Sequence, residues 1–250
     1  MPSVLIALLV GLGVCQLAFF VTTIFLHRTV AHRSIAMCRP LHFTCRVLVW
    51  VTTGIQPRQW AAVHRRHHAF TDVEGDPHSP VLEGFATVEF GNAWLYRKAA
   101  NDERTLARYA RDIPKDRWDR LVFQHGLLGL GVGYAVVALV IGWPLALLAW
   151  AVHIVTYLLF NGAINAVGHS FGRRRFDGYA TNNQWLAWLV AGEGLHSNHH
   201  AAPTSARLSM RSGEIDPAWP VIRLARRLRL LTVRHNRPVL AGRGRLPDPV

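Results

Sequence analysis

Cysteine is scarce in this chain of 250 residues, which contains only Cys15, Cys38 and Cys45. All three lie in or beside apolar segments without a paired spacing, so we expect neither a disulfide framework nor a thiolate metal site. An iron–sulfur cluster, which usually takes about four thiolates, is excluded as well. The glycines of "GLGVG", residues 129–133, sit in an apolar stretch and indicate close helix packing rather than a dinucleotide-binding fingerprint.

Acidic residues are also few. The 15 Asp and Glu stand against 28 Lys and Arg, which gives a formal net charge of +13 at pH 7. Such a basic balance is common in nucleic-acid-binding proteins, but no nucleic-acid motif accompanies it here, and we expect no nucleic acid among the partners. The arginines flank apolar segments, so anionic membrane lipid, an acidic redox protein or a phosphate-bearing substrate accounts better for the charge.

Long apolar runs are what the chain has in abundance. Half of its residues are hydrophobic and the mean hydropathy is +0.15. Residues 4–26 are 23 positions without a formal charge. At about 1.5 Å per helical residue they can cross a hydrocarbon core of about 30 Å, so we predict a transmembrane helix. A cleaved signal peptide is the competing interpretation, but no basic segment precedes the run and the run is too long.

Two further runs, residues 121–142 and 143–165, predict a membrane hairpin that turns at "GWP". Residues 41–56 form a shorter apolar run. Because this run carries Arg46, which is costly at mid-bilayer, we expect it at the interface or inside the protein.

Four histidine groups are spread along the sequence. Positions i, i+3 and i+4 of a helix share one face, so the quintets "HRRHH" and "HSNHH" would each point three imidazoles the same way. Histidine is a common transition-metal ligand, which predicts a metal site built from several groups; a solvated His-rich turn is the alternative for either quintet alone. The groups are His64, His67 and His68; His196, His199 and His200; His27 and His32 in "HRTVAH"; and Asn165 with His169 in "NAVGH".

His27 and His32 are the weak point of this prediction. On a regular helix, positions five apart diverge by roughly 140°. The two rings therefore converge only if the helix ends or bulges between them.

The predicted spans leave all four histidine groups on one side of the membrane, as a shared site requires. Basic residues cluster on the same side, in the connection over residues 96–120 and in the segment that follows Asn165. The positive-inside rule makes this side cytoplasmic.

The number of histidines indicates how many metal ions the site holds and which reaction type it suits. Nine are too many for one ion and enough for two, each with about four or five ligands. Hydrolytic zinc sites usually take about three protein ligands and an open position. Two redox-active metals bound by neutral nitrogen beside a membrane suit oxygen chemistry on an apolar substrate, with iron as the leading candidate.

The four groups and the segments around them resemble the histidine boxes of the membrane fatty acid desaturases. The matching segments are "HRTVAHR", "HRRHHAFTDVEGDPHSP", "NAVGH" and "GEGLHSNHH", within a similarity from about residue 5 to about residue 233. The resemblance is to the acyl-CoA delta-9 (stearoyl-CoA) type, with its bacterial members. It implies an all-α integral membrane protein, multi-pass in a bacterial inner membrane: a transmembrane helical bundle with a cytosolic helical cap, a histidine-rich diiron site and a kinked acyl tunnel.

The resemblance also implies a ligand set and a reaction. The reaction would be reductive activation of O2, removal of two hydrogens from adjacent methylenes of a long-chain acyl-CoA or acyl lipid, and release of water with a cis double bond. One iron would be held by His27, His32, His64, His68 and either His199 or His200, and the other by His67, His169, His196 and the remaining histidine, with Asn165 holding a metal through water.

The chain departs from the family pattern in one respect. Members usually have two spans, as a hairpin, before the first box, and this sequence has one. We expect the N-terminus to face outward, with the place of the missing helix left open or taken by a partner chain.

Several residues outside the boxes each have two interpretations. Those of the turn "TDVEGDPHSP" would orient ligand imidazoles or simply form an Asp/Gly/Pro turn; they are Asp72, Glu74, Asp76 and His78. Gln59 and Trp60 would line the acyl tunnel or pack in an aromatic core.

Four more histidines lie outside the boxes: His42, His125, His153 and His235. For His125 and His153, which fall inside apolar spans, we predict hydrogen-bonded core histidines.

Residues 220–235, "PVIRLARRLRLLTVRH", predict a basic amphipathic helix. Its apolar face carries Val221, Leu224, Ala225 and Leu228, and its arginines lie largely off that face. The helix would lie on the membrane surface or, equally, pack on the core of its own domain.

The sequence leaves three functional classes to compare. A desaturase is the first; a hydroxylase or ketolase on the same diiron scaffold is the second, because the same oxidant can return oxygen instead of removing a second hydrogen. A metal transporter or sensor is disfavoured, since its ligands should lie within spans along a pathway. In each case we expect one domain over residues 1–235 and a loose tail over residues 236–250.

Electrons must come from outside the chain, because it has no redox cofactor motif of its own. We expect a ferredoxin or a cytochrome b5-like protein with its reductase. Arg173, Arg174 and Arg175, close behind His169, would attract such an acidic donor or else bind a lipid or nucleotide phosphate.

Overall fold

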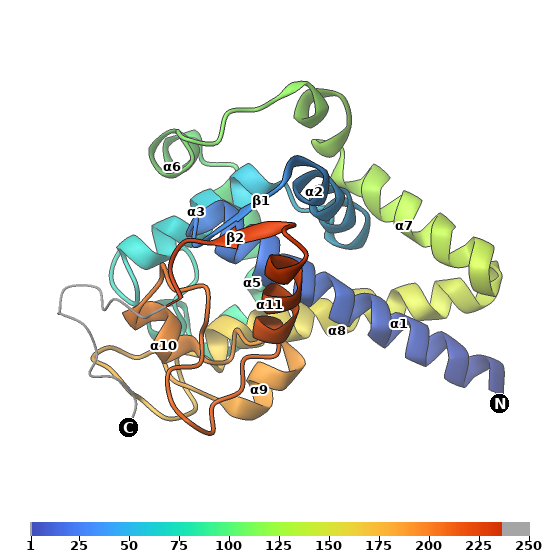
Figure 1. The fold of residues 1–250 in the computed structure, drawn as a ribbon. Helices are drawn as coiled ribbons and strands as arrows, with labels where there is room; N and C mark the ends of the chain where they lie inside the picture. The colour runs from blue at the N-terminus through green and yellow to red at the C-terminus, as the bar shows by residue number, and fades with distance from the viewer. Residues whose placement is uncertain (1, 237–250) are drawn as a thin grey trace.

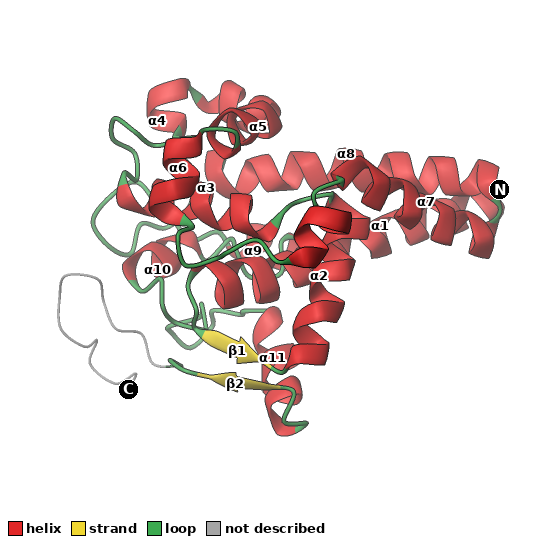
Figure 2. Cartoon of the chain, turned by 90° about the horizontal axis from the view of Figure 1, so that it is seen from above, coloured by secondary structure: helices red, strands yellow, loops and turns green. Residues whose placement is uncertain are grey.

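The computed structural model describes residues 2–236, and the predicted loose tail, residues 236–250, falls outside them except for its first residue. The described chain is mainly helical (Figures 1 and 2). In chain order its elements are α1 (Pro2–Val21), η1 (Thr22–Ala31), β1 (Ile35–Met37), α2 (Arg39–Thr53), α3 (Pro57–Ala69), α4 (Pro80–Glu83), α5 (Phe85–Ala100), α6 (Glu103–Tyr109), η2 (Asp119–Phe123), α7 (Gly126–Ile141), α8 (Trp143–Ala166), α9 (Gln184–Leu189), α10 (His196–Ala201), α11 (Ala218–Arg227) and β2 (Leu231–Val233).

Two helices are long and apolar enough to cross a membrane. They are the continuous stretch Ser3–Ala31, formed by α1 and η1, and α8, Trp143–Ala166. Long apolar helices therefore cover residues 4–26 and 143–165, as predicted.

The middle apolar run differs from its prediction. α7 begins only at Gly126 and has 16 residues, while Leu121 belongs to the separate η2. His125 lies exposed between η2 and α7, so the prediction of a core histidine at this position is wrong. Its carbonyl accepts hydrogen bonds from Trp50 Nε1, at 3.0 Å, and from the Gly129 N–H in the first turn of α7, at 3.2 Å.

The three longest apolar elements extend together to one end of the molecule. Figures 1 and 2 show α1, α7 and α8 side by side, with the N-terminus and the α7–α8 turn at this end and α3 and α10 at the other. Leu9, Leu139 and Val140 on these helices are 60, 87 and 77% exposed. So much exposed apolar surface suits hydrocarbon better than water.

α2 packs closely on α7. A Cβ atom at Gly129 or Gly133 would collide with the backbone carbonyls of Trp50 and Val51. The predicted role in close helix packing is confirmed for Gly129 and Gly133, whereas Gly131 faces open space.

Arg46, on α2, lies inside the protein, which is one of the two locations predicted for residues 41–56. Its side chain is 9% exposed and forms ion pairs with Asp116, at 2.7 Å, and with Asp119. The guanidinium also lies 4.2 Å from the ring centroid of Phe123. Two carboxylates and an aromatic face compensate for the lost hydration of the charge.

A small sheet corrects the all-α prediction. β1 and β2 pair antiparallel, with Ile35 opposite Val233. The helix predicted over residues 220–235 is accordingly too long: α11 ends at Arg227, and Arg229 takes a positive φ of 58° before β2 begins. The partner of β2 lies far upstream in the sequence, so the local amphipathic pattern contains no sign of it.

α11 contacts the domain core through one side only. Ala218 and Ile222 are fully buried against the core, whereas Val221, Leu224 and Leu228 are exposed. Because most of the predicted apolar face points away from the core, the structure favours the membrane-surface interpretation of this helix.

A buried ion pair joins η1, which carries the first histidines, to the loop just before α11. Arg28 Nη2 lies 3.1 and 3.2 Å from the two carboxylate oxygens of Asp216, and both side chains are at most 1% exposed. Gly192 lies against this pair at a φ of +104°, where a Cβ atom would collide with Asp216. The pair therefore fixes η1 relative to the segments before α10 and α11.

We expect Arg28→Met or Asp216→Asn to lower the free energy of unfolding by about 3–5 kcal/mol, because either change leaves a buried charge without its partner. Arg33→Met is the control: Arg33 pairs with Asp112 but is 53% exposed, and its loss should change the free energy by about 1 kcal/mol or less. Denaturant unfolding of the detergent-solubilised protein, followed by far-UV circular dichroism, measures both. Equal losses for the buried and the exposed pair would contradict this prediction.

Candidate metal centre

α3 presents the first quintet. Pro57 opens this helix, where its missing N–H removes no helical hydrogen bond. One face of the helix then carries His64, His67 and His68 toward the centre of the cap. The Trp60 ring stacks on His64 with a centroid distance of 4.7 Å and an interplanar angle of 14°, which restricts the orientation of the imidazole.

A π-helix brings His27 and His32 together. Residues Thr22–Ala31 form η1, in which N–H groups bond to carbonyls five residues earlier. The His32 N–H donates to the His27 carbonyl at 3.0 Å, and the two ring centroids are 4.8 Å apart. The bulge that the sequence requires between these residues is therefore present, and the geometric objection to their convergence is removed.

The remaining groups come from the end of α8 and from α10. Asn165 lies in the last turn of α8, and His169 follows shortly after the helix ends. The short helix α10 begins at His196 and carries the whole second quintet. Ser197 is held by its N–H bond to the Thr181 carbonyl, at 3.1 Å, so the loop after α8 positions α10.

The histidine nitrogens gather into two groups. Within each group the ligand atoms lie within 4.8 Å of one another. The first group consists of His27, His32, His64 and His199, and the second of His67, His169, His196 and His200. His68 Nε2 lies 2.7 Å from His199 Nε2, which associates it with the first group. Of the two arrangements that the sequence left open, the structure has His199 with the first group and His200 with the second.

The spacing of the nitrogens tests whether metal ions fit. His27 Nε2 and His199 Nε2 are 3.0 Å apart, and His169 Nε2 and His196 Nε2 are 2.9 Å apart. Adjacent ligands around an ion with metal–nitrogen distances of about 2.1 Å lie about 3 Å apart. Since this is the observed spacing and neutral imidazoles are the usual ligands of iron and similar metals, each group fits one such ion.

Three carboxylates hold the outer nitrogens of these imidazoles. Asp76 accepts from His67 Nδ1 at 2.9 Å, and Asp72 accepts from His169 Nδ1 at 2.7 Å. In the first group His27 Nδ1 lies 2.7 Å from Glu193. The two hydrogen bonds fix the tautomers of His67 and His169 and turn their Nε2 atoms toward the shared centre, while Glu193 places a carboxylate beside the outer nitrogen of His27.

Two of these carboxylates were predicted from the sequence, and Glu193 was not. Asp72 and Asp76 orient imidazoles, as one of the two interpretations held, and they also shape a turn, since Asp76 accepts from the Asp72 N–H. Glu74 is exposed and takes no part. Glu193 lies three residues before His196, and the only local signal was this position in "GEGLHSNHH".

Burial and crowding favour the neutral form of three histidines of the centre. Burial, followed by the charges of neighbouring histidines, lowers the pKa of His64, His68 and His199 well below its usual value. Burial alone would raise the pKa of Asp76, but the hydrogen bond and charge of His67 outweigh it and lower that pKa to about 2. Neutral imidazoles present free lone pairs, as metal binding requires.

Two neighbouring cavities lie at the centre. A chamber of about 60 Å³ reaches both groups, because its lining includes His27, His64 and His196. A larger cavity of about 540 Å³ is lined by residues of α2, α5 and α8. Trp60, Tyr96 and Asn161 line both cavities, and Gln59 lines the larger one.

His153 lies on the wall of the larger cavity and is 1% exposed. It bonds through Nε2 to the Thr52 carbonyl at 2.7 Å, so the prediction of a hydrogen-bonded core histidine is confirmed.

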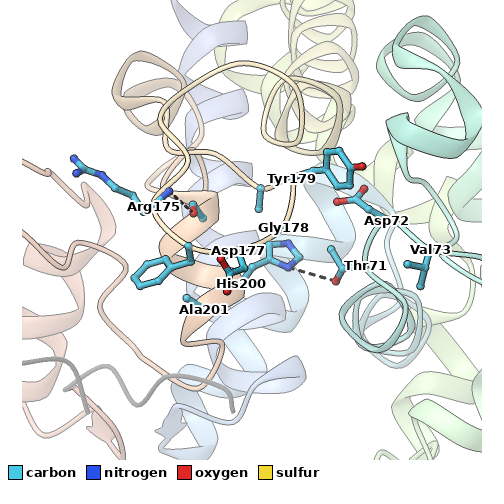
Figure 3. Close-up of a pocket in the computed structure, with 12 residues that line it drawn as sticks. Thr71, Asp72, Val73, Arg175, Asp177, Gly178, Tyr179, His200 and Ala201 are labelled. Atoms are coloured by element: carbon cyan, nitrogen blue, oxygen red, sulfur yellow. Dashed lines mark hydrogen bonds between the residues drawn. The ribbon is translucent and has the colours of Figure 1, made fainter. Parts of the chain in front are cut away.

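An open hollow of about 620 Å³ lies on another side of the centre (Figure 3). His200 lines it, with Nδ1 3.5 Å from Thr71 Oγ1. Arg175 and Tyr179, from the loop after α8, line it as well. The hollow brings one histidine of the second group to the surface of the cap.

The chain matches the family model described as "Fatty acid desaturase" over residues 2–235. The chain belongs to the fatty acid desaturase family. The resemblance stated from the histidine boxes is thereby confirmed at the level of the family.

Relatives of this desaturase include the acyl-CoA 5-desaturase AL21 of Anemone leveillei, 34% identical over 217 residues, which are 85% of this chain and 66% of the relative. The sn-1 stearoyl-lipid 9-desaturase of Anabaena variabilis is 30% identical over 238 residues, 89% of this chain and 83% of the relative. The protein of the same name from a Synechocystis species is 28% identical over 221 residues, 85% of this chain and 68% of the relative. The chain thus spans about two thirds of the length of the Anemone and Synechocystis proteins. The names differ in substrate carrier and in bond position, so the delta-9 acyl-CoA type and the bacterial origin stay predictions.

We expect Glu193→Gln to weaken metal binding by the first group about 10- to 100-fold, because the amide no longer provides a charged acceptor for His27. Glu74→Gln is the matched control, since Glu74 is exposed and bonds to no histidine of either group. Metal retained per chain after graded chelator treatment measures the effect. Equal retention by the two variants would remove Glu193 from the support of the site.

Proposed function

We propose that this protein is an O2-dependent diiron desaturase that inserts a cis double bond into a long-chain fatty acyl substrate. The observation that carries the proposal is a pair of neighbouring cavities at the histidine groups. A cavity of a volume typical of ligand sites shares the walls Trp60, Tyr96 and Asn161 with a chamber that both histidine groups line. An apolar chain that entered the chamber from the larger cavity would bring one short segment of its length to the metals.

The ligand set follows from the two histidine groups. One iron would be held by His27, His32, His64, His68 and His199, and the other by His67, His169, His196 and His200, with Asn165 acting through water. The chemistry that iron supplies in such a site is the activation of O2, which amino-acid side chains cannot perform.

The protein's own contribution is position and exclusion of water. Asp72, Asp76 and Glu193 orient imidazoles through their outer nitrogens. Trp60, between chamber and cavity, would hold the acyl chain beside His64, on which it stacks. A chain fixed in this way presents the same pair of methylenes in every turnover, which gives one bond position and lowers the entropic part of the barrier.

The substrate carrier, the bond position and the location of the protein belong to the same proposal. We take the substrate to be an acyl-CoA and the position delta-9, with acyl lipid and other positions as the alternatives that the relatives' names provide. We also propose a multi-pass protein of a bacterial inner membrane, made of one domain over residues 1–235. Its histidine end would face the cytoplasm, since Arg-rich segments lie at that end.

Expression of the chain should add a mono-unsaturated fatty acid to the host's lipids, with a mass two units below its saturated precursor. His67→Ala and His199→Ala should abolish the product, because each removes a nitrogen from one group, while the protein still inserts and folds. His235→Ala, at an exposed side chain outside both groups, is the control and should retain it. Gas chromatography with mass spectrometry measures the product and its double-bond position.

The outcomes separate the alternatives. A product that gains oxygen instead of losing hydrogen would identify a hydroxylase or ketolase. Wild-type product from His67→Ala or His199→Ala would remove that residue from the ligand set.

We further propose that an acidic electron carrier, a ferredoxin or a cytochrome b5-like protein, docks over the hollow of Figure 3. Electron transfer falls steeply with distance, and His200 offers a route from this hollow to the second histidine group. The exposed Arg173 and Arg174 stand beside Arg175 in the loop that lines the hollow. Their positive field would steer an acidic partner to this face.

Turnover of the purified protein should require a carrier and its reductase in addition to NADPH, and should fall as salt rises. Arg174→Glu should raise the carrier concentration needed for half-maximal turnover about tenfold at low salt, whereas Arg108→Glu, on α6, should not. Full turnover with NADPH alone would refute the external donor. An equal effect of the two variants would refute only the docking face.

A further inference from the structure

His78 has no assigned partner although it is buried beside the centre. It is 7% exposed, and neither Nδ1 nor Nε2 has a hydrogen-bond partner. Its backbone is fixed, because its N–H donates to Asp76 Oδ1 at 3.1 Å. A buried imidazole has a donor and an acceptor nitrogen, and leaving both unmatched is unfavourable.

The ring lines the 60 Å³ chamber rather than a dry core. Two further polar atoms without partners belong to the same lining, Asn92 Oδ1 and Tyr96 Oη, both from α5. Asn161 and Asn165 face the chamber from α8. A cavity with this many unmatched polar groups holds ordered water when it has room, and about 10–15 Å³ of free volume is enough for one molecule.

The position of His78 argues against direct metal ligation. It belongs to neither group of four histidines and gathers only with His67 and Asp76. Asp76 already accepts from His67 Nδ1, and His67 Nε2 faces His200 Nε2 at 3.2 Å. The His78 ring, 4.8 Å from that of His67, therefore stands behind a member of the second group and beside the chamber.

We propose that His78 is a positioning residue of the second metal site, which acts by holding a water molecule in the chamber together with Asn165 and Asn92. The inference rests on the proposed diiron function and adds a residue to it. The water would occupy the chamber side of the second group, where the acyl chain and O2 must also enter. His78 would thereby determine how that coordination position is filled before substrate arrives.

The test uses the full-length protein in detergent, reconstituted with Co²⁺ as a spectroscopic probe. His78→Phe should keep about two Co²⁺ per chain and an unchanged melting temperature. It should alter the visible absorption of Co²⁺ and release one of the two ions to chelator about tenfold faster, as loss of an outer partner does. His78→Gln, whose amide can still bond to water, should stay close to wild type. His153→Phe is the matched control, a buried histidine far along the other cavity, and should change neither metal measurement.

Two results would overturn the inference. One is a His78→Phe protein with wild-type absorption and release rate. The other is the loss of one ion from both His78→Phe and His78→Gln, which would make His78 a direct ligand. His78→Ala repeats the measurement if the phenylalanine variant fails to fold. A wild-type chain that binds fewer than two ions would instead contradict the proposed diiron function itself, so the two failures are distinguishable.

Discussion

Imidazole lone pairs that point at one another repel unless a metal ion or a shared proton lies between them, and nine histidines of this protein form one network of contacts. His32 Nε2 and His64 Nε2, for example, lie 2.7 Å apart. The carboxylates of Asp72, Asp76 and Glu193 act against this repulsion from outside, since each fixes a ring by its other nitrogen. Much of the cap consists of the segments that position these carboxylates and rings.

Backbone strain collects around the same segments. Arg33, Asp72 and Ala191 have positive φ values of 55°, 60° and 50°, and these are three of the four such non-glycine residues in the described chain. Arg33 follows His32, Asp72 holds His169, and Ala191 leads into Gly192 and Glu193. Each such conformation costs of the order of 1 kcal/mol or more, which the buried packing around it must offset. Convergence of the rings is thus reached at the expense of local backbone preference.

The sequence predicted the elements whose signal is local. The quintets give their helical faces directly, and residues 4–26 and 143–165 are apolar enough to be found by length alone. Asp72 and Asp76 were found because they lie in the same segment as the first quintet. The features that the sequence did not reveal depend on partners far away in the chain. Glu193 contacts His27, the His125 carbonyl bonds to Trp50 of α2, and β2 forms by pairing with β1.

The separation of its parts along the chain also gives the site an order of assembly. His27 touches His199, 172 residues later, and Arg28 pairs with Asp216, 188 residues later. During synthesis the two helices long and apolar enough to cross a membrane, α1 with η1 and α8, are complete before α10 exists. Until α10 is made, His27, His32 and His64 lack the ring that completes their group. Metal can fill the finished site only once the last segments of the cap have folded back onto the first, so a nascent or truncated chain would be an inserted but metal-poor protein.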